Sequence, residues 1–282
     1  MAILGVFAFA VLDALLKSVA IRFPTLEVVF LRFASASVFA TLLLAWSRPS
    51  MPTREAVFAT FLRACVTVGA TAGFVYAVSV LPLANAVVLA YTAPFFMVLF
   101  GWLLLGEAVT RRAAAAIAVG FAGILVTMAG RLTMADSAAL LLGSGSAVLS
   151  GACYALSMIL ARQRSAHDTV EFTVWGQSIF SSLLVLPFAI GGWQPLDAGA
   201  AISFSAIGLA AVVAQCLAVW AFMHAAATRV APIEFTSILW AGIFGYLIFG
   251  EHPGIATLLG ALLIAASGLM VTSQQSTPVE SG

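Results

Sequence analysis

Charged residues are scarce in this sequence, and their scarcity decides its class. Only 8% of the 282 residues are charged, 63% are hydrophobic, and the mean hydropathy is +1.12. Soluble domains carry about 25% charged residues. The composition therefore excludes a soluble globular protein and predicts an integral membrane protein, with the lipid bilayer as its surroundings. The 12 basic and 11 acidic residues form no run of either sign, so no nucleic-acid partner is expected.

Cysteine, histidine and the common catalytic motifs are equally poorly represented. Cys65, Cys153 and Cys216 stand singly in apolar segments, without the spacing of a metal site or a disulfide framework. Three scattered histidines, and the absence of HExxH, GxSxG and Walker A sequences, leave no catalytic constellation. We therefore expect no enzyme activity, no catalytic residue, no metal, no cofactor and no ATP hydrolysis by this chain.

Long apolar runs fill almost the whole chain. A helix needs about 20 apolar residues to cross the hydrocarbon layer. Charges, prolines and glycine clusters divide the chain into ten such segments: 2–20, 26–46, 56–80, 84–105, 112–130, 138–162, 170–190, 200–226, 231–249 and 254–273. The predicted fold class is thus an all-α integral membrane protein with ten transmembrane helices. Pro82 and Pro94 predict helix breaks near 81–85 and 90–94, and the polar tail 274–282 is expected to be disordered.

The ten segments divide into two sets of five. A shift of 144 residues places Glu27 on Glu171 and the Gly106-Glu107 pair on Gly250-Glu251. The sequence thus predicts two domains, residues 1–131 and 138–273, each a repeat of five helices. Because five is odd, the second repeat enters the membrane inverted, which is typical of secondary transporters. Basic residues are twice as frequent at one set of helix ends, which predicts that both termini are cytoplasmic in a bacterial inner membrane.

Two Gly-Glu pairs carry a resemblance to a known family. Each closes an apolar helix ("LLLGE", "LIFGE") and precedes a glycine-bearing span that ends "GILVT" or "GLMVT". With the duplication, this pattern resembles the paired EamA domains of the drug/metabolite transporter superfamily over residues 2–273. The resemblance implies a carrier of small metabolites whose cavity is lined by the first spans of each repeat. Substrates vary widely within that superfamily, so the cargo stays open.

Three charged residues interrupt the first two predicted helices. Asp13 and Lys17 lie four residues apart and share a helix face, and Arg32 belongs to the next span. Some branches of the family share this Asp-x-x-x-Lys and the following Arg. We expect the three to meet, either as a structural ionic clamp or as a site for substrate or a coupling proton. Their surplus positive charge suits a carboxylate or phosphate, although Lys17 could instead extend to the outer interface.

Other ionisable residues within the predicted spans offer further alternatives. Glu234 either pairs with Arg229 or faces the cavity as a proton- or amine-binding group. His224 titrates near neutral pH, so it is a coupling candidate, as are Asp13 and Glu234. Arg63 is expected to extend to the cytoplasmic surface.

Aromatic and amide side chains complete the candidate substrate site. Trp220 falls on Tyr76 under the repeat, and Phe235 falls on Tyr91. Rings in a bundle usually pack or anchor at the interface, and buried amides need a partner or a ligand. The remaining cavity candidates are Tyr154, Trp175, Gln177, Gln215 and Trp240.

The sequence therefore predicts a secondary transporter for a small polar metabolite, such as an amino acid or a related carboxylate or amine. Alternating access is expected, with proton coupling or exchange. The alternative is a channel, or a ligand sensor that does not transport.

Overall fold

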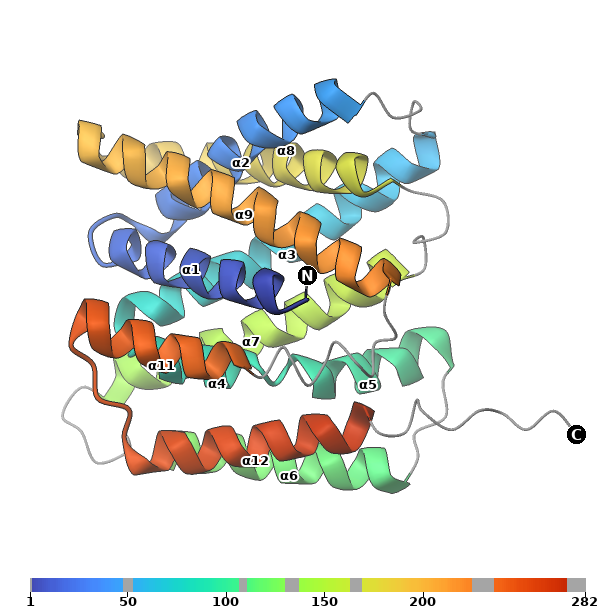
Figure 1. The fold of residues 1–282 in the computed structure, drawn as a ribbon, viewed down its shortest axis with the longest axis vertical. Coiled ribbons are helices and arrows are strands. Elements are labelled where there is room, and N and C mark those ends of the chain that lie inside the picture. The colour runs from blue at the N-terminus through green and yellow to red at the C-terminus, as the bar shows by residue number, and fades with distance from the viewer. Residues whose placement is uncertain are drawn as a thin grey trace, which may run out of the picture.

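The computed structural model describes residues 2–47, 53–106, 111–129, 137–162, 169–224 and 236–272. Within these ranges all regular structure is helical (Figure 1). The helices are α1 (Ala2–Ala20), α2 (Thr25–Ser47), α3 (Arg54–Val80), α4 (Leu83–Ala90), α5 (Ala93–Leu105), α6 (Arg111–Ala129), α7 (Ser137–Arg162), α8 (Val170–Ala189), η1 (Ile190–Gly192), α9 (Ala198–His224), α11 (Thr236–Phe249) and α12 (Ile255–Thr272).

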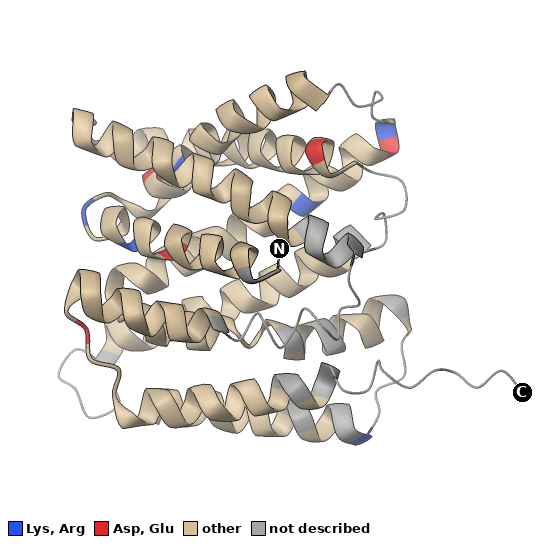
Figure 2. Ribbon diagram, in the orientation of Figure 1, with Lys and Arg blue, Asp and Glu red and all other residues tan. Residues whose placement is uncertain are grey.

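Length and composition make this a membrane fold. Five of the described helical stretches are long and apolar enough to cross a membrane: Thr25–Ser47, Arg54–Val80, Ala138–Leu160, Val170–Gly192 and Ala198–Ala218. Large apolar side chains such as Leu42, Phe188 and Leu262 lie exposed on the outside of the bundle, where lipid would cover them. Figure 2 shows how few charged residues interrupt the helices. The prediction of an all-helical, multi-pass integral membrane protein is confirmed.

One predicted span is divided into two helices. The segment expected as a single helix over 84–105 forms α4 and α5, which meet at Tyr91 and Thr92. Pro94 lies in the first turn of α5, where the backbone N–H groups have no partner within the helix, so proline is tolerated there. Likewise α3 ends at Val80, and Leu81 after it is extended because Pro82 follows. Both breaks lie where the prolines predicted them. Of the segment 231–249, the described part begins at Thr236.

Helices from distant parts of the chain pack in a regular arrangement. α12 lies along α6, α3 along α7, α1 along α9, and α2 along α8 (Figure 1). Further contacts join α2 with α9, α3 with α8, α5 with α7, and α1 with α11. Glycine permits the closest of these approaches. A Cβ placed on Gly260 of α12 would lie 1.9 Å from the Thr127 hydroxyl and 2.7 Å from the Gly123 carbonyl oxygen of α6.

Candidate functional site

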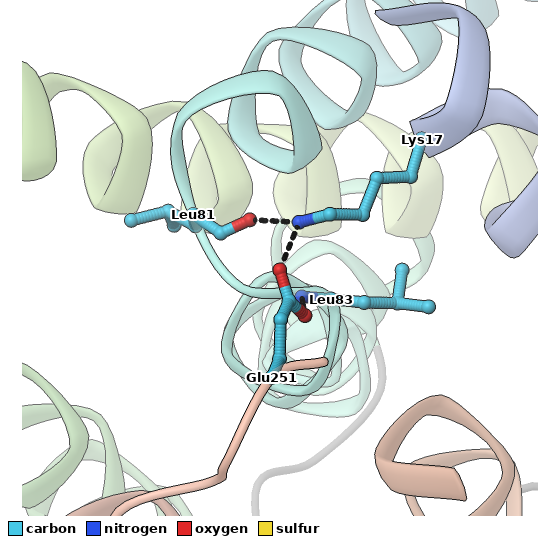
Figure 3. Close-up of polar contacts among 4 residues, drawn as sticks. All are labelled: Lys17, Leu81, Leu83 and Glu251. Atoms are coloured by element: carbon cyan, nitrogen blue, oxygen red, sulfur yellow. Dashed lines mark hydrogen bonds and ion pairs between the residues drawn. The ribbon is translucent and has the colours of Figure 1, made fainter. Parts of the chain in front are cut away.

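An ion pair joins the C-terminal end of α1 to the segment that follows α11. Lys17 Nζ lies 2.7 Å from Glu251 Oε1 and donates a 2.6 Å hydrogen bond to the Leu81 carbonyl oxygen (Figure 3). Glu251 Oε2 accepts a 2.7 Å hydrogen bond from the Leu83 backbone N–H. The Lys17 side chain is 6% exposed and that of Glu251 is 19% exposed. Three segments of the chain, α1, residues 81–83 and the segment after α11, therefore converge on one charged centre.

Local backbone structure explains why these groups are available to one another. Gly250 has φ +65°, a left-handed conformation that ends α11 and lets the Glu251 N–H bond back to the Gly245 carbonyl oxygen. Leu83 begins α4, so its N–H has no partner within the helix. A carboxylate is favoured at such a helix N-terminus. The Glu251 carboxylate therefore accepts the hydrogen bond of the first N–H of α4 and pairs with the Lys17 ammonium at the same time.

The predicted pairing of Asp13 with Lys17 is wrong. The ammonium of Lys17 is directed to Glu251 and Leu81, although Asp13 lies four residues earlier on α1. The long lysine side chain reaches two acceptors at the end of α1, a carboxylate oxygen and a backbone carbonyl oxygen. Asp13 is half-buried and interacts electrostatically with Arg32, so the structure brings two of the three predicted residues together.

Arg32 of α2 is only partly satisfied. Its Nη1 donates a 2.8 Å hydrogen bond to the hydroxyl of Thr71 on α3. The guanidinium also lies 4.8 Å from the ring centroid of Phe33. Its Nε is buried and has no hydrogen-bond partner among the described residues. Because a buried donor without a partner is disfavoured by about 1 to 3 kcal/mol, the hydrogen bonding of Arg32 is incomplete in this arrangement of the helices.

A small cavity lies against Arg32. Its volume is about 30 Å³. Three helices line it: α2 with Arg32, Phe33 and Ala36, α8 with Val174, Gln177 and Ser178, and α9 with Ala211, Val212 and Gln215. Two of the predicted site residues, Gln177 and Gln215, thus share a cavity with Arg32. The mixed lining offers hydrogen-bond donors on one part and apolar carbon on another.

Arg63, a buried arginine, bonds to one of the residues that line this cavity. Arg63 of α3 donates a short hydrogen bond from Nη2 to the amide oxygen of Gln177. The Gln177 amide nitrogen donates to the Thr67 hydroxyl at 3.4 Å, and Thr67 and Ser157 lie within 3.0 Å of each other. The expectation that Arg63 extends to the cytoplasmic surface is therefore wrong, because Gln177 offers it an acceptor inside the bundle. The network ties α3 to α7 and α8.

A larger open cavity lies beside the Lys17–Glu251 ion pair. It encloses about 340 Å³. Its lining is Lys17 and Ile21 of α1, Ser79 and Val80 of α3, Leu81 and Pro82 between α3 and α4, Phe249 of α11, and Glu251. This volume lies at the lower end of the range of small-molecule pockets, about 300 to 1,000 Å³. The ion pair thus lies in the wall of a cavity large enough for a small metabolite.

The predicted aromatic residues are spread over several environments. Trp175 donates from Nε1 to the Thr41 hydroxyl at 3.0 Å, which joins α8 to α2. Trp240 packs edge-on against Phe7 with ring centroids 5.0 Å apart, which joins α11 to α1. The Tyr91 hydroxyl accepts a hydrogen bond from Ser237 at the break between α4 and α5. Tyr76 is half-buried in α3.

The remaining predictions have different outcomes. Tyr154 on α7 is 40% exposed. Glu234 and Phe235 lie outside the described residues. Trp220 and His224 belong to α9, but their side chains also lie outside the described part of the molecule. Among the described residues, no group of three His, Cys, Asp or Glu side chains could hold a metal ion.

Sequence reasoning missed two participants. Thr71 gave no signal, because a single threonine in an apolar helix is common. Glu251 belongs to the second Gly-Glu pair, which was visible in the sequence but predicted no role for the glutamate. The glycine of that pair ends α11 in a left-handed conformation, and Gly106, with φ +67°, ends α5 in the same way. The partner of Glu251 could not be read from its position in the chain.

Comparison with known proteins places this sequence among transporters. The sequence model of the EamA-like transporter family matches residues 1–129 and again residues 141–273. The pseudopaline exporter of Pseudomonas aeruginosa is 28% identical over 272 residues, which cover 95% of this chain and 93% of that protein. The riboflavin transporter of Rhizobium johnstonii is 28% identical over 284 residues, 95% of this chain and 88% of that protein.

More distant relatives cover the same length. The S-adenosylmethionine uptake transporter of Rickettsia prowazekii is 21% identical over 280 residues, which cover 99% of this chain and 93% of that protein. One protein of known crystal structure superposes with a TM-score of 0.67 at 16% identity, covering 98% of this chain and 99% of that chain. That superposition establishes a shared fold.

Proposed function

This chain belongs to the EamA-like transporter family, and on that premise we propose that it carries a small polar metabolite across a bacterial inner membrane by alternating access. It is a transporter and not an enzyme. In this proposal the two moving parts are the inverted five-helix repeats, residues 1–131 and 138–273, and both termini are cytoplasmic.

The helix packing supports the inverted repeat. If α1, α2 and α3 correspond to α7, α8 and α9, exchanging the repeats turns the α3–α7 contact into the α9–α1 contact. The same exchange relates α2–α9 to α8–α3, and α5–α7 to α11–α1. The α2–α8 and α6–α12 pairs map onto themselves, as they would about a two-fold axis. The family model also matches the chain twice, once in each proposed repeat.

The observation that carries the proposal is that buried polar contacts run between the two repeats. Lys17 of the first repeat pairs with Glu251 of the second, and Arg63 of the first bonds to Gln177 of the second. In a transporter of inverted repeats the substrate site lies between them and is exposed alternately to the two sides. Polar contacts across that boundary can form in one state and part in the other.

The cargo we propose is an amino acid or a related compound with a carboxylate and an amine. Its support is the chemistry of the interior, which combines guanidinium groups, two amides and the Lys17–Glu251 ion pair. The relatives are named for pseudopaline, riboflavin and S-adenosylmethionine, so cargo differs within the family and is not carried over from any one of them. Asp13, Glu234 and His224 are the candidate coupling groups.

Counterflow in proteoliposomes tests this function. The purified chain is reconstituted with one unlabelled amino acid or amine inside at a time, and the uptake of a trace of the same labelled compound is followed. A carrier shows a transient overshoot that saturates with concentration. Linear, non-saturating flux would instead indicate a channel, and ligand-induced stabilisation without flux for any compound would indicate a sensor.

A further inference from the structure

We propose that the cavity beside Arg32 receives a carboxylate group of the cargo, with the Arg32 guanidinium as its anchor and the Gln215 amide as a second donor. This inference rests on the proposed transport function and names the chemical class of the group that binds. The site is distinct from the larger cavity at Lys17 and Glu251.

The first support is the incomplete bonding of Arg32. One terminal nitrogen is held by Thr71 at 2.8 Å, which orients the planar guanidinium, while Nε is buried without a hydrogen-bond partner among the described residues. Asp13 interacts with Arg32 electrostatically, but no ion pair between them lies within 4.0 Å in the described part of the chain. A guanidinium oriented in this way, with donors still unsatisfied, suits a planar carboxylate.

The second support is the lining of the cavity. No aspartate or glutamate is among the described residues that line it, and Asp13 acts on Arg32 from outside this lining. The oxygen of the Gln177 amide is occupied by Arg63, and the Ser178 hydroxyl donates to the Val174 carbonyl at 2.8 Å. Gln215 faces the same cavity from α9, and its amide N–H groups can donate to a carboxylate oxygen.

The third support is size. A volume of about 30 Å³ has room for about two water-sized groups, which matches the two oxygens of a carboxylate. A tetrahedral phosphate with three peripheral oxygens would require the helices to separate further. Phe33, Ala211 and Val212 supply the apolar part of the wall, where the first carbons of the cargo would lie.

The test uses the purified full-length chain in detergent and measures its thermal unfolding midpoint with matched probes. The probes are acetate and acetamide, succinate and succinamide, and benzoate and benzamide, at constant ionic strength. We expect at least one acid to raise the midpoint while its amide does not. Equal shifts for acid and amide, or no shift with any acid, would overturn the proposal.

Two arginine variants locate the binding. Arg32→Gln should weaken carboxylate binding roughly tenfold to a hundredfold, the loss expected for hydrogen bonds to a charged group. Arg22→Gln is the matched control, because Arg22 is 63% exposed and lies outside the cavity. Acid binding that persists unchanged in Arg32→Gln, or is lost equally in Arg22→Gln, would contradict the assignment.

A second variant keeps the proposal testable if Arg32→Gln fails to fold. Gln215→Glu is nearly isosteric and would place a carboxylate of the protein itself beside Arg32. It should abolish binding of the acid probe while the protein remains folded in its absence. Gln194→Glu, at an exposed position between η1 and α9, is the control that should bind normally. Normal acid binding by Gln215→Glu would overturn the site.

The outcomes also separate this inference from the proposed function. Saturable counterflow with no preference for acids over amides would leave the transporter proposal standing and refute the carboxylate site. Acid binding that depends on Arg32 in a protein that catalyses no counterflow would support the carboxylate site and refute the transporter proposal.

Discussion

Lys17 and Glu251 form a 2.7 Å ion pair that draws together α1, the α3–α4 connection and the segment after α11. Each charge also has a backbone partner, the Leu81 carbonyl for the ammonium and the Leu83 N–H for the carboxylate. The pair is thus oriented by the backbone and lies in the wall of the larger cavity. It is suited to fasten the two proposed repeats at this end of the molecule.

Removing one member of this pair should destabilise the protein strongly. Lys17→Met leaves Glu251 charged and largely enclosed, and we expect a loss of about 2 to 3 kcal/mol, somewhat below the value for fully buried pairs because Glu251 is 19% exposed. Lys17→Met combined with Glu251→Gln should lose less than the sum of the single changes. Unfolding in detergent measures this, and strict additivity would contradict a direct pair. Asp197→Asn, at an exposed pair 3.9 Å apart, should change stability by less than about 1 kcal/mol.

Glycine at position 151 should be required for the contact of α7 with the break between α4 and α5. A Cβ there would lie 2.7 Å from the Ala90 carbonyl oxygen and 2.8 Å from the Thr92 hydroxyl. Gly151→Ala should therefore lower the unfolding midpoint, since overpacking typically costs about 1 to 3 kcal/mol. Gly145→Ala in the same helix meets nothing within 4 Å and should be neutral or slightly stabilising. Equal effects of the two changes would refute the close approach.

The Arg63–Gln177 contact should contribute to both stability and transport. Gln177→Leu removes the acceptor of a buried guanidinium, and we expect a loss of about 1.5 to 3 kcal/mol of stability together with reduced counterflow. Thr67→Val removes the 3.4 Å bond from Gln177 and the 3.0 Å contact with Ser157, and it should cost less because neither involves a charged group. A double-mutant cycle of Arg63→Met and Gln177→Leu measures the coupling. A coupling near zero would show that the two side chains do not act together.

The variant Asp13→Asn should distinguish proton-driven accumulation of the cargo from its exchange. If its carboxylate carries the coupling proton, Asp13→Asn abolishes accumulation driven by a proton gradient and leaves counterflow intact. Asp197→Asn, exposed and distant from the interior, should preserve both. Proteoliposomes with and without an imposed pH gradient make the comparison. Undiminished accumulation in Asp13→Asn would remove this residue from the coupling role.

Much of the architecture was predictable because hydrophobic length alone limits what a chain can do in a bilayer. The helix breaks followed from Pro82 and Pro94, since the proline ring forbids a continuous helix wherever it occurs. The structure places Gln177 and Gln215 in the lining of one cavity, and their role in binding cargo stays a prediction. Pro94 predicted the break between α4 and α5, although residues 84–105 were expected to form a single span.

Side-chain partners were predictable only when they were close in the chain. The i, i+4 spacing predicted that Asp13 pairs with Lys17. The position of Arg63 near a helix end predicted that its side chain extends to the membrane surface. Both expectations failed because better acceptors arrive from elsewhere, Glu251 for Lys17 and Gln177 for Arg63. Local spacing reports which groups can meet along one helix, and it carries no information on which helices adjoin.

The sequence by itself determined that this protein is helical, lies in a membrane and is a transporter of the EamA-like family, because hydropathy, proline positions and the Gly-Glu pairs are properties of the chain alone. Only the tertiary structure decided that Lys17 pairs with Glu251 and that Arg32 and Gln215 line one cavity. These relationships depend on how α1, α2, α9 and α11 pack, and packing is set by the combined shapes of all the helices.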